Sequence, residues 1–378
     1  MKFDQIPLSL YIHIPWCVKK CPYCDFNSHA ATGELPEKAY IDQLLFDLET
    51  QLSFVQNRAI HSIFIGGGTP SLFSPEAYEK LFARLRDHLD ISNQIEITLE
   101  ANPGTTEASR FKGYFDVGIN RISLGVQSFQ DEKLKVLGRI HDNNQAKNAF
   151  HEARRAGFQN INIDLMFGLP NQTIDDALFD LQTAIDLSPN HISWYQLTLE
   201  PNTFFYRFPP KLPDDDYRFE IQNAGQKLLH ENNFEQYEIS AYAKIKSQHN
   251  LNYWLFGDYL AIGAGAHAKL TDFNSGKIMR RWNTKHPKQY LSANKNNLFE
   301  TKIILEKELP LEFMMNALRL MQPIAIEMFE VRTGLKFSVI EKEIAKAIEM
   351  GFLKLEKNYF QVTKKGYLFL NEFLEIFL

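Results

Sequence analysis

The chain has 378 residues, of which 44% are hydrophobic and 23% charged, and its net charge is −5. This length and composition indicate a globular protein with a sizeable core, and they exclude a disordered or fibrous chain. The acidic balance and the lack of a concentrated basic run argue against a nucleic-acid partner. No apolar run approaches the roughly 20 residues that cross a bilayer, and no secretory leader stands before the first predicted strand. We therefore expect a soluble, cytoplasmic protein.

The chain alternates short apolar segments with helical patterns, which is typical of the α/β class. Segments rich in β-branched residues predict six strands, at residues 8–14, 62–65, 96–99, 121–126, 160–166 and 192–197. Amphipathic stretches such as "PEAYEKLFARLRDHL" lie between them. This order predicts a parallel sheet with right-handed crossovers, here a partial (β/α)6 barrel of the TIM type. Because chemistry in such barrels sits at the carboxyl ends of the strands, we expect the site in the loops that follow them.

The pattern changes toward the C-terminus. We expect residues 1–240 to form the barrel, 241–300 to form a connecting region, and 301–378 to form a winged-helix-like α+β domain. Three helical patterns precede "GFLKLEKNYFQVTKKG", whose alternation predicts a two-stranded wing. The helix "VIEKEIAKAIEMG" has more glutamates than lysines, so we expect this domain to face protein rather than DNA. The last segment, "YLFLNEFLEIFL", is expected in the core, with a dimer face or a membrane-surface contact left open.

The loop after the first predicted strand holds all three cysteines of the chain, Cys17, Cys21 and Cys24, in a CxxxCxxC pattern. Three thiolates leave one coordination position open. They can hold three irons of a 4Fe–4S cluster and leave the fourth iron for a substrate or cofactor. A structural zinc site completed by His13 or His29 is the alternative, and buried or redox-active thiols are a third interpretation.

This cysteine spacing resembles the radical S-adenosylmethionine (SAM) superfamily. In that superfamily the free iron binds the amino and carboxylate groups of SAM, and reduction of the cluster yields a 5′-deoxyadenosyl radical. The resemblance therefore implies a 4Fe–4S cluster on the three cysteines, SAM as a cofactor and a separate electron donor as a partner.

Further segments resemble one family within this superfamily, the oxygen-independent coproporphyrinogen III oxidases. They are "YIHIPWCVKKCPYC", "GGGTPS", "LEANPG", "GVQSF", "LGRIHD", "NIDLMFGLP" and "EFMMNALRL", and together they span nearly the whole chain. The resemblance implies that the cluster-bound SAM is contacted by Tyr11, Gly67 and Glu100. It implies a second SAM site formed by Tyr23, Gly68, Thr69, Gln127, Arg139 and Asp164. These residue types suit the ligand, because glycine permits close backbone approach, carboxylates accept from ammonium and hydroxyl groups, and arginine pairs with a carboxylate.

One position departs from the oxidases. They carry a further cysteine two residues after the third one, and this chain has Phe26 at that position. The sequences "CPYCDFNSH" and "HNLNYW" instead resemble a heme chaperone branch of the family. Histidine is a common heme ligand, and flat aromatic rings pack on a porphyrin. The resemblance implies that His249 ligates heme iron and that Tyr253 and Trp254 pack on the ring. His267 is a second candidate ligand, and a surface histidine beside two core aromatics is the alternative for the motif.

The function expected from these features is binding of heme and its transfer to apo-hemoproteins, with a 4Fe–4S cluster and SAM bound to the same chain. One alternative is an enzyme that decarboxylates the propionates of coproporphyrinogen III by radical chemistry. The other is a zinc-binding module with a winged helix. The expected partners are heme, apo-hemoprotein recipients and an electron donor. Nucleic acid is not expected, and a peripheral membrane contact and a homodimer are left open.

Overall fold

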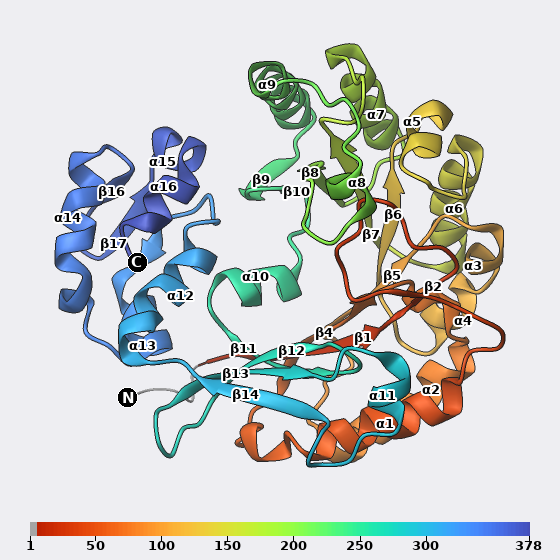
Figure 1. Cartoon of the computed structure of the whole chain (residues 1–378), viewed down its shortest axis with the longest axis horizontal. Helices are drawn as coiled ribbons and strands as arrows, with labels where there is room; N and C mark the ends of the chain where they lie inside the picture. The colour runs from red at the N-terminus through yellow and green to blue at the C-terminus, as the bar shows by residue number, and fades with distance from the viewer. Residues whose placement is uncertain (1–5) are drawn as a thin grey trace.

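The computed structural model describes residues 6–378, apart from the side chains of residues 105 and 106, and one twelve-stranded sheet forms its body (Figure 1). All six predicted strands lie side by side and parallel in this sheet. They are β1 (Leu8–Ile14), β4 (Ile60–Gly67), β5 (Glu96–Ala101), β6 (Arg121–Gln127), β7 (Asn160–Phe167) and β8 (His191–Gln196). The order has two free ends, β14 and β9, so the barrel is partial and the predicted fold is confirmed.

Helices cover the outer face of the parallel strands, as crossover connections require (Figure 1). The longer ones are α1 (Glu37–Glu49), α2 (Pro75–His88), α6 (Asn143–Ala156), α7 (Ile174–Asp186) and α9 (Asp215–Glu231). The shorter ones are α3 (Thr105–Ser109), α4 (Phe111–Asp116), α5 (Asp131–Val136) and α8 (Phe204–Arg207). The ends of helix α6 are set by its own sequence. Asp142 and Gln145 form a capping box at its start, and Gly157 ends it with a φ of 113°.

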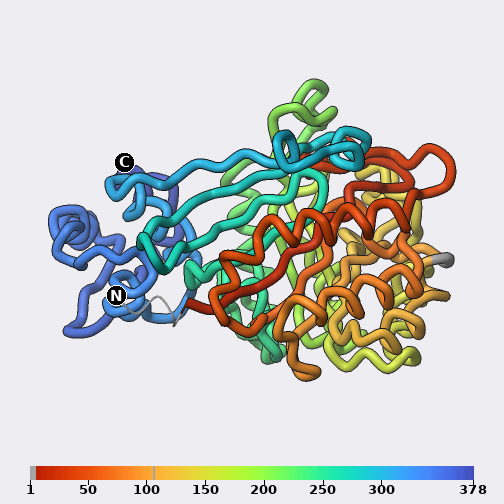
Figure 2. The backbone as a smooth tube through the Cα atoms, turned by 90° about the horizontal axis from the view of Figure 1, so that it is seen from below, coloured from red at the N-terminus to blue at the C-terminus, as the bar shows by residue number. Residues whose placement is uncertain are grey.

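Residues 235–303 extend the same sheet at both edges. Strands β9 (Glu235–Glu238) and β10 (Ala241–Ala243) add antiparallel beside β8. On the other side β11 (Asp258–Ile262) pairs parallel with β1, and β12 (His267–Thr271), β13 (Ile278–Asn283) and β14 (Phe299–Ile303) follow antiparallel, with α11 (Pro287–Leu291) before β14. Helix α10 (Gln248–Trp254) joins the two edges, and it carries the HNLNYW sequence. Figure 2 shows these late strands running beside the N-terminal part of the chain.

The C-terminal part has its own core, built around Phe313, Phe329, Phe352, Phe360 and Phe373. Its helices are α12 (Leu309–Ala317), α13 (Ile326–Thr333), α14 (Glu341–Glu349), α15 (Lys364–Leu368) and α16 (Leu370–Glu375). A small sheet holds β15 (Ile324–Ala325), β16 (Leu353–Leu355) and β17 (Tyr359–Val362), and β16 and β17 form the predicted wing. Within the described residues, no helix has the length and hydropathy needed to cross a membrane.

Candidate functional site: two cavities at the barrel rim

The cysteine loop is fastened at both ends. Strands β2 (Trp16–Cys17) and β3 (His29–Ala30) pair across its base, and the amide of Ala31 donates to the carbonyl of Cys17 at 2.8 Å. All three thiols are free and half-buried. They line one cavity of about 340 Å³ together with Gly67, Gly68, Thr69, Glu100, Asn102, Ser123, Gln127, Arg139, Asp164 and Tyr195, among others. The barrel thus brings loops from five strand ends to the three cysteines.

The donor set around the cysteines fits a cluster on three thiolates better than a Cys₃His zinc site. Arg139 donates from Nη1 to the sulfur of Cys21 at 3.6 Å, so a guanidinium lies beside the cysteine loop. His13, one of the two candidate zinc ligands, is engaged at both ring nitrogens: Nε2 donates to the carbonyl of Asn27 at 2.8 Å, and Nδ1 accepts from Tyr11 at 2.9 Å. Within residues 6–378, no three His, Cys, Asp or Glu side chains, the three cysteines included, converge on a position for a single ion.

Two buried carboxyl groups line this cavity. Glu100 accepts from the amide of Gly67 at 3.0 Å, and burial together with the charge of Asp164 raises its pKa to about 8. Asp164 accepts from Ser123 at 3.0 Å and from Asn162 at 2.8 Å, and burial raises its pKa as well. Among the described residues, neither carboxyl group has an ion-pair partner. Such a site suits a ligand that brings ammonium or hydroxyl donors.

The glycines of "GGGTPS" are required by the packing. A Cβ at Gly68 would lie 2.5 Å from the carbonyl oxygen of Trp16, and Gly67 has a φ of 115° with the ring of His13 against it. The remaining predicted polar residues lie close by. Arg139 donates from Nη2 to Asn102 Oδ1 and to the carbonyl of Gly125, both at 2.6 Å.

Sequence reasoning missed three residues of this cavity. Tyr195 donates to the side chain of Gln127 at 2.6 Å, Ser123 bonds Asp164, and Asn102 bonds both Arg139 and Thr69. Asn102 lies within the quoted "LEANPG" segment, so its polarity at a strand end was an available signal. Ser123 and Tyr195 sit inside apolar strands, and only the barrel geometry turns them toward the cavity.

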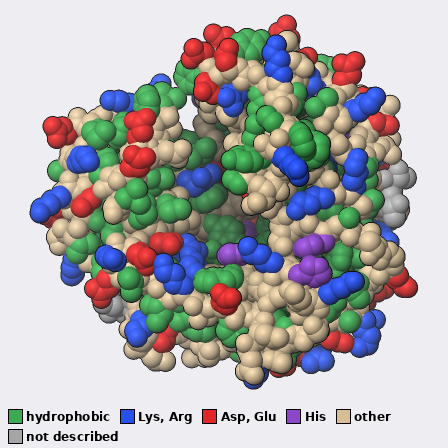
Figure 3. All heavy atoms as spheres, in the orientation of Figure 1, with side chains coloured by type: hydrophobic (Ala, Val, Ile, Leu, Met, Phe, Trp, Pro, Cys, Tyr) green, Lys and Arg blue, Asp and Glu red, His purple; other side chains and the backbone are tan. Residues whose placement is uncertain are grey.

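A second cavity, of about 680 Å³, adjoins the first through shared walls at Phe26, Gly67 and Glu100. Its other lining residues include Tyr11, Lys20, Tyr253, Trp254, Tyr259, His267, Lys285 and Asn316. Because Asn316 belongs to α12, this cavity lies between the barrel and the C-terminal domain. Figure 3 shows the central hollow of this face, with hydrophobic side chains at its floor and basic and histidine side chains around it.

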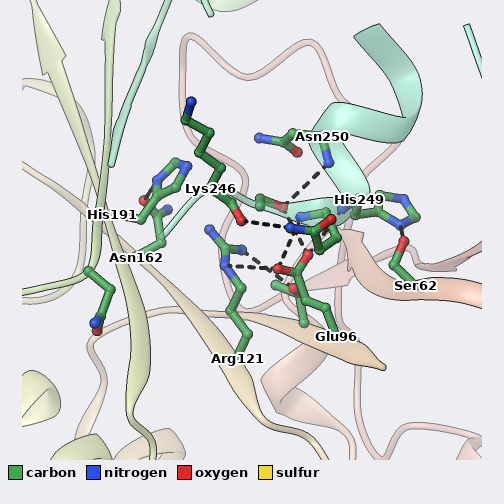
Figure 4. Close-up of polar contacts among 12 residues, drawn as sticks. Ser62, Glu96, Arg121, Asn162, His191, Lys246, His249 and Asn250 are labelled. Atoms are coloured by element: carbon green, nitrogen blue, oxygen red, sulfur yellow. Dashed lines mark hydrogen bonds and ion pairs between the residues drawn. The ribbon is translucent and has the colours of Figure 1, made fainter. Parts of the chain in front are cut away.

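Two of the three predicted heme residues line this second cavity, and the third does not. Tyr253 and Trp254 reach it from the end of α10. His249 is 1% exposed, and its ring stacks on Phe64 with centroids 5.2 Å apart. Its Nδ1 shares a hydrogen bond with Ser62 at 2.9 Å (Figure 4). Its Nε2 shares one with the hydroxyl of Tyr253 at 2.9 Å. Burial lowers the pKa of this imidazole to about 3, so the ring is neutral.

A polar network holds the start of α10 at the opposite, amino-terminal end of the barrel strands (Figure 4). Glu96, the first residue of β5, accepts from Ser247 Oγ at 3.0 Å and from the amides of Gln248 and His249 at 3.1 Å. Arg121, the first residue of β6, lies with Nε 4.0 Å from Glu96, and both side chains are buried. The helix that carries the heme motif is therefore anchored in the barrel floor.

Comparisons with known proteins agree with this geometry. The model of the radical SAM superfamily matches residues 11–183, and that of the HemN C-terminal domain matches residues 304–369. Proteins named heme chaperone HemW are 54% identical in Haemophilus influenzae and 50% identical in Escherichia coli K12, each over 98% of both chains. The solved structure of the radical SAM enzyme coproporphyrinogen III oxidase (HemN) from Escherichia coli superposes with a TM-score of 0.82. The superposition covers 98% of this chain and 90% of that one at 23% sequence identity, so it shows that the two proteins share a fold.

Proposed function

The chain belongs to the heme chaperone HemW family, with a radical SAM fold, and on that premise we propose that it binds heme and delivers it to apo-hemoproteins. The observation that carries the proposal is the second cavity. It presents the exposed ring of Phe26 and the partly exposed rings of Tyr253 and Trp254, which match the flat ring of heme. It also presents the exposed imidazole of His267 and two lysines, which match the iron and the two propionates. We also propose that the heme is transferred in the cytoplasm and that a separate protein donates electrons to this chain.

We further propose that Cys17, Cys21 and Cys24 hold a 4Fe–4S cluster beside this site. A cluster on three thiolates supplies one iron without a protein ligand, which SAM can bind through its amino and carboxylate groups. The chain's own residues then orient SAM: the backbone of Gly67 approaches it closely, and Glu100 accepts from its donors. The deeper polar residues, Tyr23, Gly68, Thr69, Gln127, Arg139 and Asp164, are proposed to hold a second SAM, while Tyr11 contacts the first.

For heme, the proposal uses the end of α10. Tyr253 and Trp254 pack on the porphyrin. The HNLNYW motif indicates His249 as the ligand of the heme iron, but the burial of this ring argues against it. Ligation by His249 requires its hydrogen bond to Tyr253 to break and its ring to leave the core. Phe26, which is 60% exposed between the two cavities, replaces a thiol of the oxidases with an apolar ring, and this favours heme binding over propionate decarboxylation.

The test is a hemin titration of the full chain, purified and reconstituted with iron and sulfide without oxygen, followed by mixing with an apo-globin. We expect saturable binding of one hemin and its appearance in the globin spectrum. A variant with all three cysteines changed to serine separates the cluster from heme binding. No saturable binding, together with SAM-dependent turnover of coproporphyrinogen III, would contradict the proposal and assign the chain to the decarboxylases.

A further inference from the structure

The heme cavity contains an imidazole whose nitrogens make no hydrogen bond to the described residues. His267 is the first residue of β12, and it follows the loop that leaves the carboxyl end of β11. It is exposed in the second cavity, and within the part of the chain that the structure describes neither of its ring nitrogens has a hydrogen bond. Its ring lies at 26° to that of Trp282, with centroids 6.4 Å apart. His249, in contrast, uses both nitrogens inside the core.

The backbone that carries His267 is fixed to the cysteine loop. Asn27 donates from Nδ2 to the carbonyl of Ala264 at 2.9 Å and to that of Lys285 at 2.8 Å. Gly265 has a φ of 72°, and a Cβ there would lie 2.4 Å from the same Asn27 nitrogen. The amide of Gly265 donates to Thr284 O at 3.0 Å, and that of Asn283 to Ala266 O at 2.9 Å. Since the loop is held on both sides, the imidazole is positioned before any ligand enters.

The surroundings of His267 fit an iron porphyrin with ionised propionates. Phe26 and Trp254 both contribute apolar ring surface to the cavity wall, and the guanidinium of Arg319 in the C-terminal domain lies 4.6 Å from the ring centroid of Trp254. Lys285, exposed near His267, and Lys20 both line the cavity. Ammonium groups beside an apolar slot pair with carboxylates at the edge of a flat ligand.

We propose that His267 is the axial ligand of the heme iron in this cavity, and that His249 acts as a positioning residue that holds the Tyr253 side chain in the cavity wall. The inference rests on the proposed heme binding and names its iron ligand. The bond formed is Nε2 or Nδ1 of a neutral imidazole to iron, with displacement of a water or hydroxide from free hemin, and no oxidant or reductant is needed.

The experiment compares hemin and metal-free protoporphyrin IX as probes of the reconstituted full chain. The variants are His267→Ala, His267→Met, His249→Ala and the control His88→Ala, an exposed histidine at the end of α2. Absorption and electron paramagnetic resonance spectra report the iron ligand, and fluorescence quenching by protoporphyrin IX reports the porphyrin pocket without the metal. Added imidazole tests chemical rescue.

We expect His267→Ala to lose the wild-type hemin spectrum and to bind hemin about tenfold more weakly, as removal of one coordinate bond implies. Its affinity for protoporphyrin IX stays at the wild-type value, imidazole restores the spectrum, and His267→Met gives a thioether-ligated spectrum. His249→Ala and His88→Ala keep the wild-type ligand spectrum. If His267→Ala does not fold, as loss of protoporphyrin IX binding would show, the His267→Met spectrum decides.

Two results overturn the inference and leave the proposed function in place. One is a wild-type hemin spectrum and affinity in the His267 variants. The other is a spectrum lost in His249→Ala and kept in His267→Ala, which assigns the iron to the motif histidine. Absence of saturable hemin binding in the wild type is a different failure, because it removes the proposed function itself.

Discussion

Two glutamates on β5, Glu96 and Glu100, lie four residues apart on the same face of the strand and have opposite surroundings. Glu96, at the floor of the barrel, accepts three hydrogen bonds from the start of α10 and lies beside Arg121. Glu100, at the rim, receives one amide hydrogen bond from Gly67 and faces Asp164 across an open cavity. The floor carboxylate is thus satisfied by protein, whereas the rim carboxyl still needs a partner.

The difference separates structural polar groups from ligand-binding ones. A buried charge that is paired in the protein stabilises one arrangement of the chain, and its removal leaves the partner unpaired. A buried carboxyl without a cation destabilises the ligand-free fold in its charged form, and a bound ligand relieves that cost. The same contrast distinguishes His249, paired in the core, from His267, unpaired in the second cavity.

The largest effect on stability is expected at the floor. Glu96→Ala leaves Arg121 as a buried charge beside three unpaired donors of α10, and it should lower the free energy of unfolding by about 3 to 5 kcal/mol. Denaturant unfolding measures the change, with Glu79→Ala on the exposed side of α2 as the matched control. A loss of less than about 1 kcal/mol would show that the network does not anchor α10.

Glu100 at the rim should destabilise the fold when it is charged, whereas Glu96 at the floor stabilises it. The pKa of Glu100 is about 8 in the folded chain and near 4.5 when unfolded, so the folded state binds more protons between these values. Stability from this group is therefore present below about pH 4.5 and falls as the pH rises toward 8, by up to about 1.4 kcal/mol per pH unit. Glu100→Gln should flatten this slope and weaken SAM binding. The measurement is the unfolding free energy at pH 6 and pH 8, together with a SAM titration.

A second variant measures how much the charge of Asp164 contributes to the pKa of Glu100. Asp164→Asn keeps Glu100 and removes the neighbouring charge, so the pKa of Glu100 should fall and part of the slope should disappear. An unchanged pH dependence in both variants would mean that Glu100 is already compensated in the ligand-free protein.

A smaller loss of stability is expected at Tyr253, which connects the core residue His249 to the wall of the second cavity. Tyr253→Phe removes the hydroxyl that bonds His249 Nε2 and leaves that buried nitrogen unpaired, so unfolding should become easier by about 1 to 3 kcal/mol. Thermal unfolding of this variant is compared with Tyr206→Phe, an exposed tyrosine of α8. Equal stability of the two variants would indicate that His249 does not depend on Tyr253.

The smallest effect on stability is expected at Phe26. Because its ring is 60% exposed, Phe26→Ala should change the free energy of unfolding by no more than about 0.5 kcal/mol. Hemin binding should nevertheless weaken, since the ring is part of the cavity wall. Val18→Ala, in the same loop and 55% exposed, is the matched control. Unchanged hemin affinity in Phe26→Ala would remove this side chain from the heme site.

The sequence by itself determined the barrel and the cysteine site. Each parallel strand is a short apolar run between turn residues, so its position follows from local pattern, and β1 spans the predicted residues 8–14. The carboxyl ends of parallel strands share one edge, which is why the loops after them were expected to meet at Cys17, Cys21 and Cys24. The glycines of "GGGTPS" indicated a close backbone approach from the residue type alone, although the groups they approach, His13 and Trp16, are known only from the structure.

Only the tertiary structure decided which of the two candidate heme ligands, His249 and His267, lines the second cavity. His249 stood in the more suggestive sequence motif, yet its ring is held by Ser62, 187 residues earlier in the chain, and by Phe64 on the same strand. His267 gained its place because residues 235–303 complete the main sheet, so that β11 pairs with β1 and brings its loop to Asn27. Burial and pairing of a side chain depend on contacts between distant segments, and no local pattern records them.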